Sequence, residues 1–217
     1  MNIDVIYVII VLGVVLVSMT LHEAMHAYAG YWLGDDTAKM SGRLSLNPIK
    51  HIDPFLTVLL PLLLAISHAP VFGAAKPVPF NPNNIRWNEW GAALLALAGP
   101  LTNLVLAFLI YGLSVLLGKP VNISGVANGI VVLILTVGVM VNLGFFIFNL
   151  IPIPPLDGSR VLYALAPEFV RRGMESMERY GIIVVFALIL IGGPVFSSLL
   201  LGSIDFFIQL FARFFGA

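Results

Sequence analysis

The chain has 217 residues, of which 59% are hydrophobic and only 10% are charged, and its mean hydropathy is +1.01. A soluble protein usually contains about 45–50% apolar and about 25% charged residues, so a soluble domain of this size has no interior for so much apolar surface. The net charge is zero, which gives no electrostatic reason to expect a nucleic-acid partner, and the absence of cysteine excludes disulfides and thiolate metal ligands. The composition therefore predicts an all-α, polytopic helical membrane protein whose first partner is the lipid bilayer.

Four apolar segments are long enough to cross a bilayer, since a helical span needs roughly 20 mostly apolar residues. They cover residues of about 3–20, 89–117, 128–150 and 181–201. The first should continue as a helix through residues 22–26, and the sequence Gly192-Gly193-Pro194 should kink or shorten the fourth. With no internal repeat and no low-complexity tail, we expect a single membrane domain over residues 1–217.

Three further segments have a less certain structure. Residues 54–67 are apolar but short and contain Pro61, whereas residues 204–215 carry phenylalanines at helical spacing, which indicates an interfacial helix or a packed tail. Residues 74–88 are rich in Pro and Asn and should be extended or turn structure. Within them, residues 76–80 could be an edge strand that pairs with a bound peptide, although the prolines, which lack an N–H, favour a plain loop.

The sequence His22-Glu23-Ala24-Met25-His26 matches the pattern H-E-x-x-H. On a helix, the spacing of four residues places both imidazoles on one face, one turn apart, where they can bind one zinc ion. Glu23 would lie beside the metal and could take a proton from zinc-bound water. Such a short pattern can arise by chance, but ionisable groups in a bilayer cost roughly 2.5–3.5 kcal/mol each and usually mark function. Metal binding explains why all three are present, since the ion binds the histidines and offsets the charge of the carboxylate.

A third metal ligand must come from another part of the chain, because catalytic zinc sites normally have three protein ligands and a water molecule. Trp32 stands where metzincins carry their third histidine, so that class is excluded. We favour Asp157, because prolines break the helix before it and Gly158 permits a tight turn that presents the carboxylate. Its alternative role is the N-cap of a helix that begins at Gly158. The other carboxylate candidates are Glu89, Glu168, Glu175, Glu178 and Asp205.

Three motifs together resemble the site-2 protease family of intramembrane zinc metalloproteases. They are the HEAMH sequence, the sequence N-x-x-P-x-P-x-L-D-G at residues 149–158, and the sequence Gly99-Pro100-Leu101-Thr102-Asn103 in the second long apolar segment. The resemblance covers residues of about 10–165. It is to the compact type of the family, without a PDZ or nucleotide-binding domain.

The resemblance implies one zinc ion per chain, bound by His22, His26 and Asp157, with Glu23 as general base and acid. Asn103 and Asn149 would lie near the site and bind the substrate backbone or stabilise the tetrahedral intermediate. Either asparagine could instead make interhelical hydrogen bonds, worth about 0.6–2 kcal/mol in a membrane.

The resemblance also implies a three-helix catalytic core within residues 3–165 and a C-terminal helical region over residues 166–217. The substrate would be a transmembrane protein, cleaved in or near its membrane segment. The alternative is a metal-binding membrane protein, either a transporter or an inactive protease-like scaffold. A transporter has no particular need for a glutamate between two ligands.

The ligand set constrains the topology, because Asp157 must reach the side of the membrane on which His22 and His26 lie. Residues 54–69 therefore cannot cross once, and must re-enter, lie flat or cross twice. Nine of the eleven Lys and Arg residues fall in the loops 34–53, 70–90 and 151–180, which this topology places on the side of the site. The positive-inside rule makes that side the cytoplasm. We therefore expect a multi-pass protein of a prokaryotic cell membrane, with its N-terminus outside and its active site open to the cytoplasm.

Overall fold

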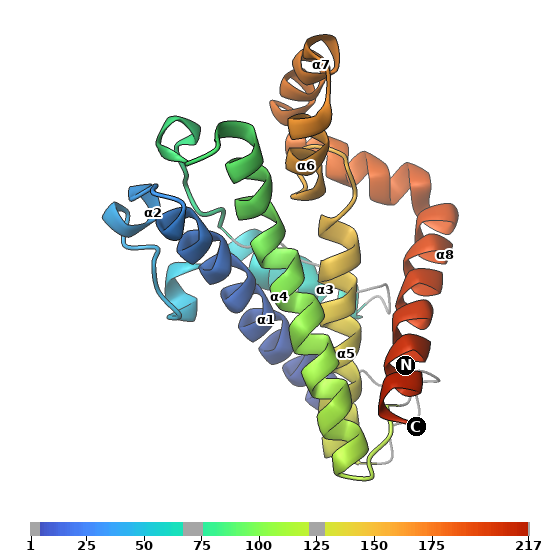
Figure 1. Ribbon diagram of the computed structural model, residues 1–217. Coiled ribbons are helices and arrows are strands. Elements are labelled where there is room, and N and C mark those ends of the chain that lie inside the picture. Colours follow the sequence, from blue (N-terminus) through green and yellow to red (C-terminus); the bar gives the residue numbers. More distant parts are fainter. Residues whose placement is uncertain (1–4, 67–75, 122–128, 217) are drawn as a thin grey trace.

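The protein is built from helices, as the computed structural model in Figure 1 shows for residues 5–66, 76–121 and 129–216. No β-strand occurs within these ranges, so the predicted all-α class is confirmed and residues 76–80 form a loop. The long helices are α1 (Val5–Trp32), α4 (Asn88–Leu116), α5 (Ile130–Asn149) and α8 (Gly181–Phe215). The shorter ones are α2 (Thr37–Met40), η1 (Pro48–Lys50), η2 (Pro54–Leu59), α3 (Leu60–Ile66), η3 (Pro82–Asn84), α6 (Gly158–Leu165) and α7 (Glu168–Glu178).

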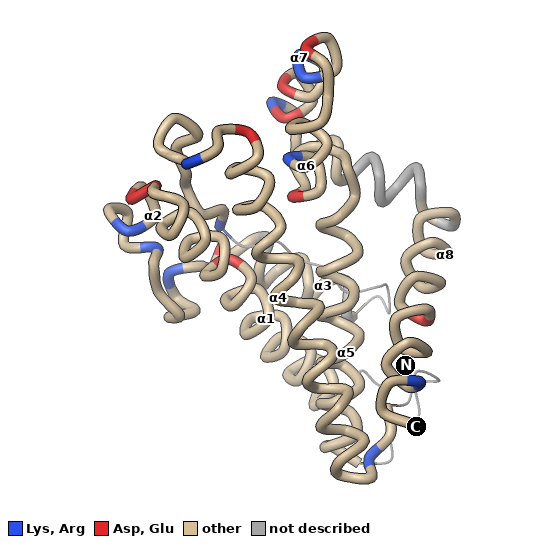
Figure 2. Tube along the Cα trace, in the orientation of Figure 1, with Lys and Arg blue, Asp and Glu red and all other residues tan. Residues whose placement is uncertain are grey.

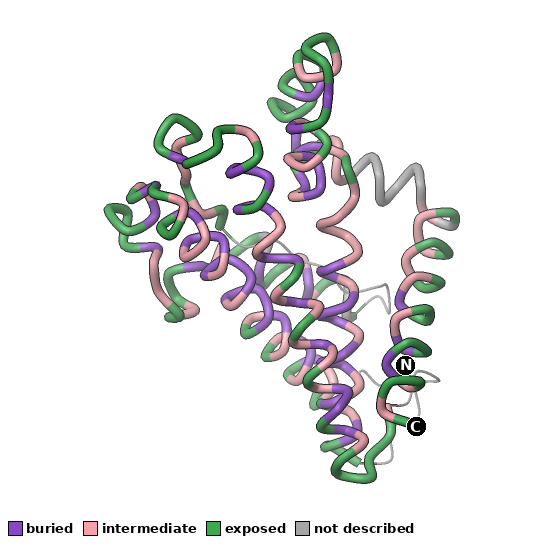
Figure 3. The backbone as a smooth tube through the Cα atoms, viewed as in Figure 1, coloured by how far each residue is buried: buried purple, intermediate pink, exposed green. Residues whose placement is uncertain are grey.

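Helices α1, α4 and α5 pack against one another and form the core of the fold. Most of the buried chain lies where these three helices run together (Figure 3). The contact between α1 and α5 is apolar, and its residues recur every four positions, so each helix offers one continuous face. The residues of this contact are Val11, Val15, Met19, Val137, Val141 and Phe145.

Helix α8 packs on the other side of α4 and α5 and is longer than the sequence indicated. A span ending near residue 201 and a separate segment 204–215 were expected, but a single helix continues to Phe215. The expected break is wrong because Gly202 costs a helix only about 1 kcal/mol, while the aromatic residues that follow pack on α4 and α5. The helix changes direction along its length (Figure 1), in agreement with a kink in a helix that contains Pro194.

Within the described part of the chain, four helical segments are long and apolar enough to cross a membrane: Val5–Trp32, Asn88–Leu116, Ile130–Asn149 and Val195–Phe215. Their outer faces expose large apolar side chains, including Ile9, Leu109 and Leu199, each at least 59% exposed. Exposed apolar surface on this scale suits a lipid environment rather than water. The chain is therefore an integral membrane protein.

Charged residues gather at one end of the helical bundle, where α2, α6 and α7 lie (Figure 2). Two basic residues belong to the opposite end. Lys119 follows the end of α4, and Arg213 is in the last turn of α8. These two helix ends are neighbours, because the Phe215 ring packs against Tyr111. The predicted topology rests on this uneven distribution, because the positive-inside rule assigns the end rich in basic residues to the cytoplasm.

The described part of the apolar segment after residue 53 is shorter than a membrane span. Helices η2 and α3 contain six and seven residues, a length of roughly 20 Å at about 1.5 Å per residue, whereas the hydrocarbon core is about 30 Å thick. The segment packs against α1. Whether it re-enters, lies flat or crosses twice depends in part on residues 67–75, which lie outside the described residues.

Candidate metal centre

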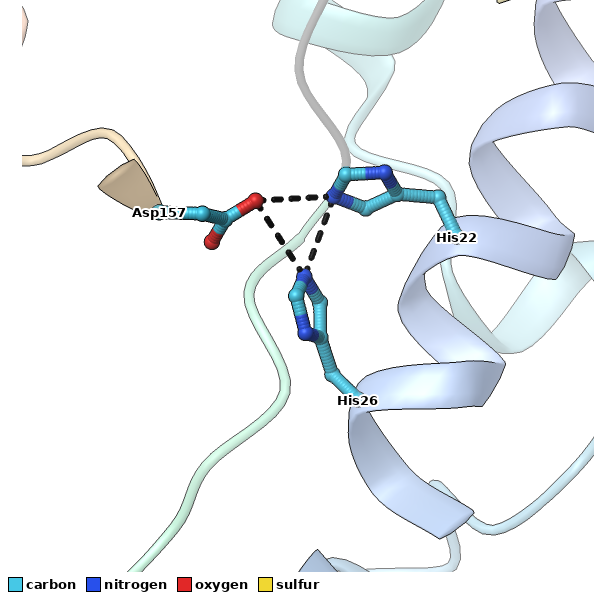
Figure 4. A group of neighbouring side chains, drawn as sticks. All are labelled: His22, His26 and Asp157. Carbon is cyan, nitrogen blue, oxygen red and sulfur yellow. Dashed lines mark hydrogen bonds and ion pairs between the residues drawn. The ribbon is translucent and has the colours of Figure 1, made fainter. Parts of the chain in front are cut away.

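Three side chains from two distant parts of the sequence meet at one point (Figure 4). Helix α1 presents His22 and His26 one turn apart, and the segment after α5 presents Asp157. The two Nε2 atoms are 3.0 Å apart, and they lie 3.2 Å (His22) and 3.4 Å (His26) from Asp157 Oδ2. Donor atoms bound to a tetrahedral zinc ion at about 2.0–2.1 Å lie roughly 3.3 Å from one another. The three atoms are therefore spaced as zinc ligands are.

His26 has a fixed tautomer, which leaves its Nε2 free to bind a metal. Its Nδ1 lies 2.8 Å from the backbone oxygen of Leu95 in α4, and because a carbonyl can only accept, the Nδ1–H must donate. The lone pair of the neutral ring is then on Nε2 and points at Asp157. Electron-rich atoms this close repel one another unless a cation or a proton lies among them, so the arrangement suits a divalent cation.

His22 is oriented by a chain of three hydrogen bonds that crosses the core. At its far end, the Nδ2–H of Asn142 donates to the carbonyl of Gly138 at 2.8 Å. Asn142 Oδ1 therefore faces Asn103 and accepts from its Nδ2–H at 2.8 Å. Asn103 Oδ1 is left facing His22 Nδ1 at 2.6 Å, so this ring also donates from Nδ1 and keeps its lone pair on Nε2. Such outer partners fix the tautomer and orientation of metal-binding histidines.

Asp157 is held in place by the turn between α5 and α6. This turn is so tight that a Cβ on Gly158 would lie 2.2 Å from the carbonyl oxygen of Leu150. Asp157 occupies the N-cap position of α6, but its side chain makes no capping hydrogen bond, so the capping alternative is wrong. Its Oδ2 is buried without a hydrogen-bond donor in the described part of the chain.

Gly99 allows α4 to pass directly beside the ligand atoms. A Cβ at this position would lie 2.4 Å from Nε2 of His26 and 2.6 Å from Nε2 of His22. No side chain larger than hydrogen can therefore occupy this position while the two rings keep their orientation. The glycine of the G-P-x-x-N sequence thus has a physical role at the candidate metal centre.

Glu23 is buried on α1, between the two histidines in sequence, and meets a different part of the chain. Its Oε2 accepts a hydrogen bond from the backbone N–H of Val78 at 3.1 Å. Val78 belongs to the coil of residues 76–81, which is the pale green coil passing the histidines in Figure 4. The carboxylate keeps its second oxygen for other contacts.

Asn149 and four of the five other carboxylate candidates, all except Glu89, make contacts elsewhere. Asn149 donates to the carbonyl of Phe145 in its own helix at 3.0 Å. Three of the glutamates and the aspartate pair with Arg, Tyr or Gln side chains elsewhere. These pairs are Glu168 with Arg172, Glu175 with Tyr163, Glu178 with Arg160 and Asp205 with Gln209. Of all described residues, His22, His26 and Asp157 form the one group of three metal-ligand side chains found close together.

Sequence reasoning missed Asn142, the Leu95 carbonyl and the Val78 amide. Asn142 could have been predicted from the sequence, because an amide in the middle of an apolar helix needs a hydrogen-bond partner. The other two are backbone groups, which every residue carries, so their role depends on the packing alone.

Comparison with known proteins places these observations in a family. The model of peptidase family M50 matches residues 117–193. A Bacillus subtilis protein named "Putative zinc metalloprotease YwhC" is 40% identical over 205 residues, which cover 92% of this chain and 90% of that protein. Proteins named "Putative zinc metalloprotease Rip2" from Mycolicibacterium smegmatis and Mycobacterium tuberculosis H37Rv are each 32% identical, over 84% and 87% of this chain and 67% and 69% of their own lengths. No solved structure gives a significant match.

The fold and the group of three side chains define a membrane metalloprotease. The chain belongs to peptidase family M50, the site-2 protease family, and its cofactor is zinc.

Proposed function

We propose that this protein is an intramembrane protease that hydrolyses a peptide bond in or near a transmembrane segment of a membrane protein. In this proposal His22, His26 and Asp157 bind one zinc ion, and Glu23 is the general base and acid. The observation that carries it is the triangle of donor atoms, with sides of 3.0, 3.2 and 3.4 Å, formed by two helix residues and one loop residue. Residues 1–217 form one membrane-embedded peptidase domain.

In this proposal the metal, Glu23 and the groups that orient the histidines have separate catalytic roles. Zinc supplies Lewis-acid polarisation of the scissile carbonyl and lowers the pKa of a bound water towards roughly 7. Glu23 takes a proton from the attacking water and later delivers it to the leaving amine. Asn103 and the Leu95 carbonyl hold the two imidazoles with Nε2 towards the metal, so the ligands are oriented before the substrate arrives.

The two asparagines differ in how well their contacts support a direct role with substrate. Asn103 is fully buried and both of its amide atoms are occupied by His22 and Asn142, which supports an orienting role. Asn149 is partly exposed near the end of α5 and bonds within its own helix, so its Oδ1 is the better candidate for contact with a substrate or the intermediate.

The proposed substrate and setting follow from the membrane location. A transmembrane helix hides its carbonyls in hydrogen bonds to residue i+4, so it must unwind before cleavage. Water and the unwound segment would enter from the side where the basic residues gather, which the positive-inside rule makes the cytoplasm. The N-terminus would then be outside a prokaryotic cell membrane.

Glu23→Gln tests this proposal against the alternative of a zinc-binding protein without protease activity. The amide cannot act as a general base but keeps the size of the side chain. We expect the purified variant to retain one zinc per chain and to lose at least about 1,000-fold in cleavage rate, with membrane fragments released by the wild type absent from cells carrying the variant. Cleavage at the wild-type rate, or loss of zinc from the variant, would contradict the assigned role.

A further inference from the structure

Arg43, in the loop after α2, is a buried arginine that lies outside the three catalytic motifs. Only 8% of its surface is exposed. Its Nη1 group donates to the carbonyl of Lys50, and its Nη2 group donates to the carbonyls of Lys76 and, at 3.2 Å, of Pro77. In the described part of the chain, the acceptors bonded to this guanidinium group are all backbone carbonyls. A planar group with five N–H donors can hold several acceptors in a fixed arrangement, which a lysine cannot do.

The contacts of Arg43 join the loop after α2 to the coil that begins at residue 76. A residue that merely stabilised its own loop would bond within that loop, but two of the three bonds cross to residues 76 and 77. Burying a cation is costly unless it is hydrogen-bonded. The Nη1 and Nη2 bonds offset part of this cost, whereas the buried Nε has no hydrogen-bond partner among the described residues. The loop and the coil are joined a second time where the N–H of Lys76 donates to the carbonyl of His51 at 3.0 Å.

The next N–H along the coil reaches the candidate catalytic residue. Val78 N–H donates to Glu23 Oε2 at 3.1 Å, directly after the two carbonyls that Arg43 holds. Further along, the N–H of Asn81 donates to Asp35 Oδ2 at 2.7 Å. Between Val78 and Asn81, Phe80 contacts Arg160 of α6, the helix that follows Asp157. The Arg160 guanidinium carbon lies over the Phe80 ring, 5.5 Å from the ring centroid. The coil thus contacts Glu23 on α1 and Arg160 on α6, and Arg43 fixes the first residues of the coil.

We propose that Arg43 is a positioning residue. It holds residues 76–78 so that the Val78 N–H fixes one oxygen of Glu23, which leaves the other oxygen directed at the water that Glu23 deprotonates. The inference rests on the proposed function, in which Glu23 is the general base. A carboxylate free to rotate would spend less time in the productive orientation, so Arg43 acts on the catalytic step rather than on substrate affinity.

The kinetic test is Arg43→Lys, which keeps the positive charge but loses the planar fork. We expect kcat to fall at least about tenfold, KM to stay within about threefold, and zinc to remain at one per chain. The matched control is Arg86→Gln, which removes an exposed cation outside these contacts and should leave kcat unchanged within about twofold. A fall in zinc content parallel to kcat, or a change in KM alone, would overturn the positioning role.

Substitutions at Val78 test the path through which Arg43 acts. Val78→Pro removes the donor to Glu23, whereas Val78→Ala keeps it and removes only the larger side chain. We expect kcat of Val78→Pro to be at least about tenfold below that of Val78→Ala. If Arg43 acts through this N–H, adding Arg43→Lys to Val78→Pro should lower kcat by less than about twofold. Multiplicative losses in the double variant would overturn the proposed path.

A second measurement does not depend on activity. The chain contains no cysteine, so Val78→Cys introduces a single thiol into the coil. In detergent-solubilised full-length protein, we expect this thiol to react with a maleimide at least about tenfold faster in the Arg43→Lys background than in the Arg86→Gln background, because local opening exposes it. Equal rates would overturn the role of Arg43. If Glu23→Gln were fully active, the proposed function would fail, while the labelling rates would still report whether Arg43 holds the coil.

Discussion

The two halves of α4 lie in different environments, although one continuous helix supplies both. Its first half carries Leu95, Gly99 and Asn103, which contact the histidines of the candidate metal centre. Its second half carries Phe108 and Tyr111, whose rings pack against the aromatic side chains at the end of α8. In the first half the contacts are specific, because the Leu95 carbonyl bonds His26 and the Asn103 amide bonds His22 and Asn142. In the second half, many similar contacts share the same surface.

This difference has consequences for how each half tolerates change. Within a bilayer, apolar side chains gain little by leaving lipid, so helices associate through packing and interhelical hydrogen bonds. A buried polar group that loses its partner costs the full desolvation penalty, while an apolar contact can be partly replaced by its neighbours. Substitutions in the metal half should therefore change zinc binding sharply, and those in the aromatic half should change stability modestly.

The largest effect is expected at Asp157, the one proposed ligand that does not come from α1. Asp157→Ala removes one of three donor atoms, so we expect the purified protein to fall from one zinc per chain to below about 0.1 and to lose cleavage. Asp205→Asn is the matched control, because its carboxylate is exposed on α8 and accepts a hydrogen bond from Gln209, outside the candidate metal centre. Elemental analysis measures both. Full zinc occupancy in Asp157→Ala would exclude this residue as a ligand.

The next largest effect is expected at Gly99. An added methyl group would lie 2.4 Å from the donor nitrogen of His26, so α4 or the ring must move. We expect Gly99→Ala to weaken zinc binding about 100-fold in a competition assay with a chelator, since ligand orientation decides affinity. Gly144→Ala on α5 is the control, because its new methyl group meets open space. Equal zinc affinity in both variants would contradict the close approach of α4.

A smaller effect is expected along the chain of asparagines. Asn103→Leu removes the acceptor for His22 and should weaken zinc binding about 10–100-fold. Asn142→Leu is one step further away and should weaken it by less than about tenfold, because Asn103 can still accept from the ring. The same chelator competition ranks the two variants. The reverse order would show that His22 is not held through Asn103.

The smallest effect on zinc is expected in the aromatic half of α4. Phe211→Leu keeps an apolar side chain against Tyr111 and Phe108, so zinc affinity should stay within about twofold while the unfolding free energy falls by about 1 kcal/mol. Thermal unfolding in detergent, recorded beside the zinc assay, separates the two quantities. A loss of zinc comparable to that of Asn103→Leu would remove the distinction between the two halves.

The sequence was sufficient for those features that depend on one segment at a time. The three core helices, the helix that carries His22 and His26, and the position of Asp157 after a proline-broken helix all follow from local pattern. The crossing of α1 and α4 does not, and it is this crossing that brings Asn103 to His22 and the Leu95 carbonyl to His26. The expectation of two segments where α8 is one helix is wrong, because Gly202 and the polar residues after it resemble a helix end. The packing of Phe211 on α4, which supports the continuous helix, cannot be read from the sequence.

The most direct test of the central claim is X-ray absorption spectroscopy at the zinc edge on the purified full-length chain. The chain has four histidines and no cysteine, so the number of imidazoles bound to zinc is informative. We predict one zinc per chain with two imidazole nitrogens and oxygen ligands at about 2.0–2.1 Å, and a loss of this spectrum in Asp157→Ala. A zinc bound by three or more imidazoles, or an unchanged spectrum in Asp157→Ala, would contradict the centre formed by His22, His26 and Asp157.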